Sequence, residues 1–286
     1  MSYIETLPTP ADYRTTHLPT IGGEYQPQSS KAGLIKASRE LEVHIMGSID
    51  PIDAADSGPV YFENNVVFAI RDWSEALGYH LLRIGGPAET KYPSGTSGIS
   101  ASVVKTAYRF KLATLYVSCN SLPKGKEKSI VSTLYSLTNQ LINQVNPLDT
   151  GVFNFSTARF QDLDGTAETW DKAISIFSDL LVYAPSPLFI VFDNIERLDG
   201  IESDRGYLDT LINLLKDQAS SQNLSGGIRK VLKILFTTTG PCETLNKLDD
   251  KVLKNITVKR QDTKRRPGEA RLGRSQIHLL MGKKDE

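Results

Sequence analysis

The sequence is poor in the residues that build disulfide-rich and zinc-binding proteins. It has two cysteines, Cys119 and Cys242, among 286 residues, and these cannot make a disulfide framework or a cysteine-based zinc site. None of its 4 histidines lies in an HxxxH or HExxH spacing. We therefore expect neither a small secreted scaffold nor a zinc enzyme.

The sequence also lacks long apolar runs and an excess of either charge. No apolar stretch approaches the roughly 18 residues that span a bilayer, and residues 1–20 lack the basic and then apolar order of a signal peptide. The 33 basic residues balance the 33 acidic ones, so no overall field attracts the chain to nucleic acid or to an anionic membrane. We expect a soluble, cytoplasmic protein with no membrane partner.

Three regions differ in composition. Residues 1–60 are rich in proline and poor in periodic apolar positions, which predicts a partly disordered N-terminal arm. Residues 61–258 carry the apolar periodicity of a folded domain. Residues 259–286 form a basic tail, in which 7 basic residues stand against 2 acidic ones over 259–274, a net charge of +5. Such a tail is usually a solvated linker, and the alternatives are nucleic-acid binding and nuclear import.

Strands and helices alternate through the middle region. Short apolar runs predict strands, and apolar residues at helical spacing predict helices between them. The expected strands cover 80–84, 113–117, 187–192, 231–236 and 256–258, and the expected helices cover 64–77, 99–110, 129–145, 170–182, 207–219 and 243–253. This order predicts an α/β fold, a mostly parallel sheet with helices on both faces. Ligands of such sheets bind beyond the carboxyl ends of the strands.

Three features carry the functional hypothesis. A loop rich in glycine, proline and hydroxyl residues lies between the first strand and its helix, where backbone N–H groups at a helix N-terminus can hold phosphate. A run of apolar residues ends in Asp193, and an acid in that place can hold magnesium. A third buried run ends in the hydroxyls of Thr237–Thr239.

These features resemble the STAND class of P-loop ATPases, which is related to AAA+ proteins, and in particular the NACHT-like domains common in fungal proteins. The phrases that carry the resemblance are LLRIGGP…SGTSGISASVVKTAYRFKLATLYVSCN, PLFIVFDNIERL and VLKILFTTTGP, within residues 64–258. The resemblance implies a P-loop NTPase-like fold with ATP and Mg²⁺ as cofactors. It identifies the second phrase as a Walker B strand and the third as a sensor strand.

The Walker A loop departs from the pattern GxxxxGK[ST]. The nearest reading is 93–100, in which Pro93 replaces the first glycine and Ile99 replaces the lysine. Carried over residue by residue, the resemblance implies that Glu196 is the catalytic base and that Ser100 and Asp193 hold the metal. The nucleotide would contact Ser94, Gly95, Thr96, Ser97, Gly98, Ser100 and Thr238.

Losing the lysine removes a charge from the phosphates and from the transition state. The sequence therefore predicts weak ATP binding with little or no hydrolysis, at most a weak ATPase. The alternative is a pseudo-ATPase that serves as an interaction module for an unidentified protein partner. Simpler interpretations remain open: 94–100 as a surface loop, Asp193 and Glu196 as caps of a turn, Thr237–Thr239 as ordinary strand residues, and an error in the gene model over 85–100.

Overall fold

A computed structural model describes residues 31–45, 61–76, 80–89, 94–120, 129–145, 157–220, 224–225, 228–258 and 270–271. Residues 1–30 and 46–60 of the expected N-terminal arm and nearly all of the expected basic tail lie outside the described residues. The part of the tail that is described, β9 (Ala270–Arg271), pairs antiparallel with β1 (Tyr61–Phe62). A second pair of short strands consists of β5 (Leu224–Ser225) and β6 (Ile228–Arg229).

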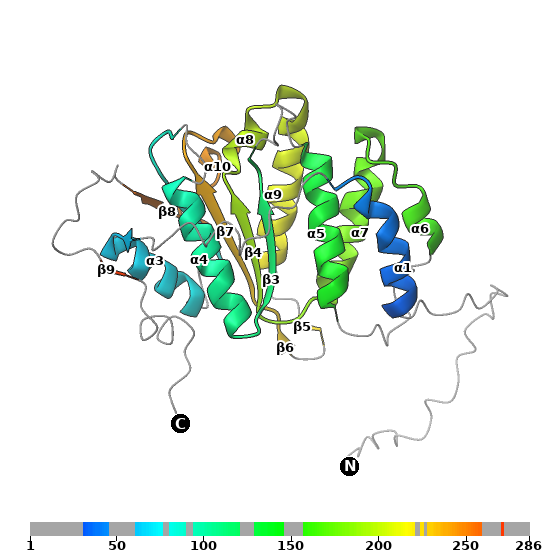
Figure 1. Cartoon of the computed structure of the whole chain (residues 1–286), viewed down its shortest axis with the longest axis horizontal. Coiled ribbons are helices and arrows are strands. Elements are labelled where there is room, and N and C mark those ends of the chain that lie inside the picture. Colours follow the sequence, from blue (N-terminus) through cyan, green and yellow to red (C-terminus); the bar gives the residue numbers. More distant parts are fainter. Residues whose placement is uncertain are drawn as a thin grey trace, which may run out of the picture.

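The centre of the fold is a sheet of five parallel strands (Figure 1). Its order is β3-β4-β7-β2-β8, so the first of these strands in the chain lies between the fourth and the fifth. Each neighbouring pair is parallel, and the connections between them contain helices, as parallel pairing requires. This confirms the expected α/β class. The strands are β2 (Leu81–Gly85), β3 (Ala113–Ser118), β4 (Leu188–Asp193), β7 (Leu232–Thr238) and β8 (Leu253–Thr257).

Two helices cover one face of the sheet. Helix α3 (Asn64–Glu75) and helix α4 (Gly95–Arg109) pack there on alternate side chains of the strands, including Leu82, Ile84 and Leu235. Trp73 of α3 meets Phe189 of β4 edge to face, with ring centroids 5.7 Å apart. Because successive strand residues point to opposite faces, the intervening residues face the other layer.

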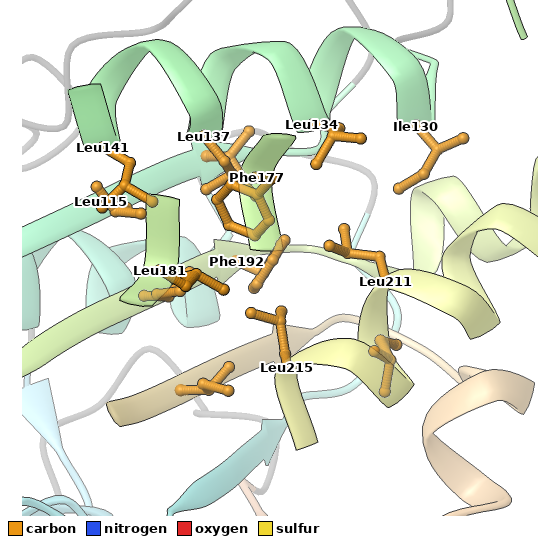
Figure 2. Packing of buried hydrophobic residues seen from close by; sticks show 14 of the residues in the cluster. Leu115, Ile130, Leu134, Leu137, Leu141, Phe177, Leu181, Phe192, Leu211 and Leu215 are labelled. Carbon is orange, nitrogen blue, oxygen red and sulfur yellow. The ribbon is translucent and has the colours of Figure 1, made fainter. Parts of the chain in front are cut away.

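The other face carries the larger hydrophobic core. Helices α5 (Ile130–Gln144), α7 (Trp170–Val182) and α9 (Arg205–Ser220) enclose it (Figures 1 and 2). Phe192 of β4 points into the middle of this cluster and stacks on Phe236 of β7 at 5.3 Å. With helices on both sides, the middle strands have no solvated face, which explains why their sequences are continuous apolar runs.

Helix α1 (Lys31–Glu42) belongs to this second layer. It lies within residues 1–60, which were expected to form a partly disordered arm with a helix running into a strand-like end over 32–49. It packs against α5 and α6 (Thr157–Gln161), and its Leu34 and Leu41 are fully buried in the larger core. The sequence left open whether residues before 61 fold onto the domain, and α1 shows that 31–42 do.

Some element boundaries differ clearly from those expected. Helix α4 begins at Gly95 rather than at Ile99, because Ser94 caps it. Helix α10 covers only Glu243–Asn246, and Leu253, expected at the end of that helix, pairs with Leu81 as the first residue of β8. Helix α6 lies between the helices expected over 129–145 and 170–182, where the sequence predicted neither a helix nor a strand. The remaining short helices are α8 (Glu196–Asp199) and the 3₁₀ turns Ala167–Thr169 and Glu202–Asp204.

We predict that Leu41→Ala lowers the free energy of unfolding by about 2–4 kcal/mol, because it leaves a cavity where α1 meets the core. Val43→Ala is the matched control, since Val43 is 81% exposed two residues away and its truncation should change stability by less than about 0.5 kcal/mol. Urea unfolding followed by circular dichroism measures both. Equal, small effects of the two variants would contradict the docking of α1.

Candidate functional site

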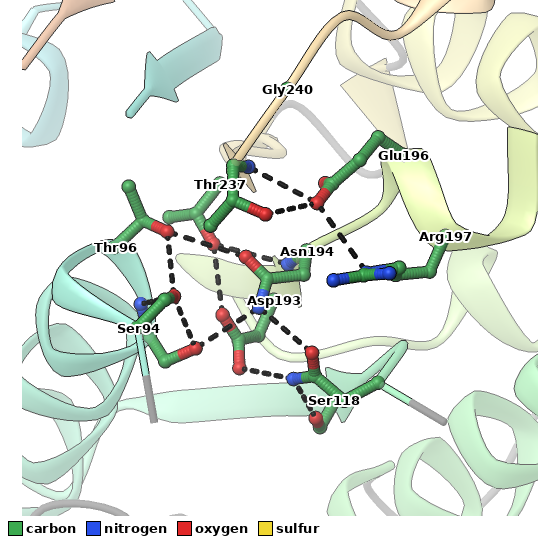
Figure 3. A network of polar contacts seen from close by, with 12 residues as sticks. Ser94, Thr96, Ser118, Asp193, Asn194, Glu196, Arg197, Thr237 and Gly240 are labelled. Carbon is green, nitrogen blue, oxygen red and sulfur yellow. Dashed lines mark hydrogen bonds and ion pairs between the residues drawn. The ribbon is translucent and has the colours of Figure 1, made fainter. Parts of the chain in front are cut away.

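The sequence motifs meet where the first turn of α4 approaches the carboxyl ends of β4 and β7 (Figure 3). The structure brings together Ser94, Thr96, Ser97 and Ser100 of the expected Walker A region with Asp193 of the expected Walker B strand. All five side chains are buried. The expected order of motifs thus produces one polar cluster at the edge of the sheet where ligands of parallel sheets bind.

The residues expected to wrap phosphate as a loop form the first turn of a helix. The Ser94 hydroxyl accepts the Ser97 N–H at 3.1 Å, as an N-cap residue does. The Gly98 N–H donates to the Ser94 carbonyl at 3.1 Å, which is the first helical bond. The chain itself therefore satisfies backbone donors that a phosphate cradle would leave open.

A carboxylate from the preceding loop lies at the same helix end. Glu89 Oε2 accepts the Gly95 N–H at 3.0 Å. An anion at a helix N-terminus is stabilised by the partial positive charge there. Glu89 thus occupies a backbone donor that a bound phosphate would use.

The loop after β2 lies close against this turn. The Gly86 N–H donates to the Thr238 carbonyl at 2.7 Å. A Cβ on Gly86 would lie 2.7 Å from Thr96 Cγ2, a separation that real Cβ atoms do not tolerate. Glycine at this position is therefore required by the approach of the loop to α4.

Asp193 lies at the centre of the cluster and is fully buried. Its Oδ1 accepts the Thr237 hydroxyl at 3.0 Å, and the Ser100 hydroxyl lies 3.5 Å from the same oxygen. Its Oδ2 accepts the Asn120 amide at 3.3 Å and faces the Tyr116 hydroxyl at 3.4 Å. These four donors are neutral, and among the residues that the structure describes no cation lies at ion-pair distance from the carboxylate.

Burial raises the pKa of Asp193 to about 6. Hydrogen bonds from Ser97 and Thr237 act in the opposite direction, and the nearby charge of Glu196 adds to the rise. Removal of the carboxylate from water is the larger effect. Asp193 is thus more easily neutral than an ordinary aspartate.

Asn194 joins the two halves of the cluster. Its backbone is in the left-handed region, with φ at 57°, which asparagine tolerates better than most residues. Its amide nitrogen donates to the Ser97 hydroxyl at 3.1 Å and to the Asn120 oxygen at 2.9 Å, and its oxygen accepts the Thr96 hydroxyl at 3.3 Å. This buried side chain ties the first turn of α4 to the ends of β3 and β4 (Figure 3).

Glu196 begins α8 and reaches the end of β7 rather than Asp193. Its Oε1 accepts the Thr239 N–H at 3.1 Å and the Thr239 hydroxyl at 2.7 Å. Its Oε2 is buried and has no hydrogen-bond partner among the described residues. The side chain therefore links two loops and keeps one oxygen unsatisfied.

Thr238 and Thr237 point to opposite faces of β7. Thr237 touches Asp193 and Ser100, on the α4 side. Thr238, which the sequence assigned to the nucleotide, instead faces the Nε of Arg83 at 3.5 Å. Thr237 is thus the residue that the period-2 alternation of the strand brings into the cluster.

In this arrangement the protein itself engages the groups that would hold the phosphates of ATP. Ile99, at the position of the Walker A lysine, is 2% exposed and packs in the core of the α4 face. The backbone donors of Gly95 and Ser97 are occupied by side chains of the protein. Among the described residues no group of three His, Cys, Asp or Glu side chains is placed to hold a metal ion. Burial raises the pKa of the Cys242 thiol to about 12, which disfavours the thiolate.

Four members of the site were not predicted from the sequence: Glu89, Tyr116, Asn120 and Asn194. Asn194 and Asn120 each lie within two residues of a strand end, and that position is the signal that identifies them. Glu89 carries no such signal, because its contact depends on the path of the loop after β2.

Comparisons with known proteins complete the description. No family model and no curated protein matches the sequence. Among solved structures, the chain resembles part of the structure of Drosophila ORC bound to GC-rich DNA and Cdc6, with 12% identity over 92% of this chain and a TM-score of 0.35. A match of equal identity and TM-score covers 87% of this chain in the Drosophila ORC structure with poly(dA/dT) DNA and Cdc6.

The chain spans 37% and 36% of the lengths of these two neighbours. A TM-score of 0.35 carries no argument about function. The α/β assignment rests on the parallel sheet itself.

We predict that the raised pKa of Asp193 makes stability depend on pH. Between the ordinary value of 3.8 and about 6, the folded protein keeps the proton that the unfolded chain has lost. The free energy of unfolding therefore falls as pH rises through this range. The change is up to about 3 kcal/mol for a shift of about two pKa units.

Asp193→Asn should remove this component, since the amide is neutral at every pH and its hydroxyl neighbours can rotate to accept its N–H groups. Urea unfolding at pH 4, 5, 6 and 7 measures the difference between the variant and the wild type, which should grow in favour of Asp193→Asn as pH rises. Asp217→Asn controls for net charge, because the Asp217 side chain is 74% exposed. A difference that stays constant over this range would contradict the pKa of Asp193.

Proposed function

We propose that this chain is a pseudo-ATPase, a P-loop NTPase-like module that keeps the α/β core and acts through contacts with a protein partner. The proposed class is the STAND/NACHT-like one, which the three sequence phrases resemble. The observation that carries the proposal is the Glu89 carboxylate on the Gly95 N–H, 3.0 Å away, at the turn where a nucleotide phosphate would sit. A phosphate brought to this turn would meet a like charge and an occupied donor.

Charge at the site supports the same conclusion. An NTPase needs cations beside the phosphates, and the buried Ile99 takes the place of the lysine. Lys105 of α4 is exposed and lies ten residues beyond the start of the helix. Asp193 is closed in by four neutral donors, which leaves its oxygens directed at protein groups rather than at a metal.

The second candidate is weak ATP binding with slow hydrolysis, and one observation favours it. Glu196 Oε2 is buried without a partner among the described residues, and a carboxylate oxygen that is free can orient an attacking water. In this alternative Glu89 must leave Gly95 before ATP binds. Ser100 and Asp193 would then contact the metal, with Ser94–Gly98 on the phosphates.

The expectations for partners and location remain proposals. We propose a cytoplasmic protein, with nuclear import or nucleic-acid binding only through the basic tail over 259–286. No helix within the described ranges is long and apolar enough to cross a membrane. The division into an arm over 1–60, a domain over 61–258 and the tail is likewise a proposal, with α1 added to the domain.

Calorimetric titration with Mg-ATP tests the proposed function. We predict no binding heat at millimolar Mg-ATP for the wild type and for Glu75→Ala, a control that removes an exposed carboxylate from the end of α3. Glu89→Ala should gain weak binding, because it frees the Gly95 N–H and removes the repelling charge. Micromolar binding by the wild type, weakened by Asp193→Ala, would contradict the proposal. If the Glu89→Ala variant also gives no binding heat with Mg-ATP, Glu89 is not the group that excludes the nucleotide.

A further inference from the structure

A groove lies on the face of the sheet opposite α4, at the carboxyl ends of β2, β7 and β8. Its volume is about 550 Å³, within the range of sites for small molecules. Gly85, Gly86 and Gly240 form part of its wall, and a Cβ on Gly240 would meet nothing within 4 Å. The polar side chains that line it are Arg83, Thr238, Asn246, Asp250, Asn255 and Thr257.

Arg83 is directed into this groove by the alternation of β2. Its neighbours Leu82 and Ile84 pack under α4, so the arginine faces the other layer. Its Nη1 donates to Asn246 Oδ1 at 2.6 Å, its Nη2 to the Gly240 carbonyl at 3.4 Å, and its Nε faces Thr238 Oγ1 at 3.5 Å. These contacts hold the guanidinium in a fixed orientation at the wall of the groove.

The charge of Arg83 is not neutralised in this position. Its three acceptors are an amide, a carbonyl and a hydroxyl, and within the described part of the chain no carboxylate lies at ion-pair distance from it. A partly buried charge without a counter-ion is costly, and an anionic ligand would compensate it. A planar guanidinium matches the oxygens of phosphate, which it binds in a two-pronged manner.

The rest of the groove is lined by side chains that can hydrogen-bond to hydroxyl groups. Asp250 accepts the amide of Asn255 at 3.3 Å, and both line the groove together with Thr257. A carboxylate, an amide and a hydroxyl suit the hydroxyl groups of a ligand. The volume also exceeds what a phosphate ion fills, so the phosphate would be one end of a larger molecule.

We infer that the groove binds a small phosphorylated molecule rich in hydroxyl groups, with its phosphate on Arg83 and its hydroxyls on Asp250 and Asn255. The side chains that would bind this molecule and the cluster around Asp193 lie on opposite faces of the sheet, and Gly86 borders both. The inferred site also requires no nucleotide at α4. The inference therefore goes beyond the proposed function and stands independently of it.

Titration of the full chain with ribose 5-phosphate, inorganic phosphate and ribose tests the inference. We expect ribose 5-phosphate to bind about tenfold more tightly than inorganic phosphate, as one or two added hydrogen bonds would give, and ribose alone to show no binding. Arg83→Gln should weaken binding of ribose 5-phosphate at least about tenfold, since it removes a charged hydrogen-bond donor. Lys247→Gln is the matched control, because it removes an exposed cation from beyond α10, outside this groove.

A second variant keeps the test valid if Arg83→Gln does not fold. Gly240→Asp places a carboxylate beside Arg83 in open space, so it should abolish binding and leave the fold intact. Wild-type protein that binds none of the phosphorylated probes at millimolar concentration would overturn the inference, as would binding that survives Gly240→Asp or Arg83→Gln. If Glu89→Ala changes the binding of ribose 5-phosphate and Arg83→Gln does not, the phosphate lies at α4. That result would also overturn the inference. ATP binding that only Asp193→Ala weakens would instead refute the proposed function.

Discussion

The burial of the Asp193 carboxylate is the constraint on which the candidate site depends. Asp193 follows a strand that is covered on both faces, and it is fully buried. A charge in that position is tolerated only if it is hydrogen-bonded or neutral. The protein supplies both conditions, because four neutral donors surround the two oxygens and burial raises the pKa to about 6. The hydroxyls of α4 and β7 and the amide of Asn120 are placed by this requirement.

The same requirement explains why the backbone N–H groups at the start of α4 are already hydrogen-bonded. The helix must bring Ser97 and Ser100 to the strand ends, and it does so by beginning at Gly95 behind the cap of Ser94. Glu89 then neutralises the positive end of the helix. Oxygen atoms of the protein thus accept the backbone N–H groups of Gly95 and Ser97 at the start of α4.

Much of the fold could be predicted from the sequence, because buried parallel strands and amphipathic helices leave strong patterns. The run ending in Asp193 is one example, and α5 is another. The face of a residue near a strand end could not be predicted, since a shift by one residue exchanges Thr238 for Thr237. The Glu89 contact and the early start of α4 depend on the three-dimensional path of a loop. The pairing of Leu253 with Leu81 depends on a distant strand, which local periodicity does not reveal.

The most direct test of the account follows the backbone amide of Gly95 by nuclear magnetic resonance. In the ¹⁵N-labelled protein, this signal should differ between the wild type and Glu89→Ala, because the variant removes the acceptor of the Gly95 N–H. In the wild type it should not move when Mg-ATP is added to millimolar concentration. A Gly95 signal that is the same in both proteins and moves saturably with Mg-ATP in the wild type would show that the turn is open to phosphate, and would contradict the account.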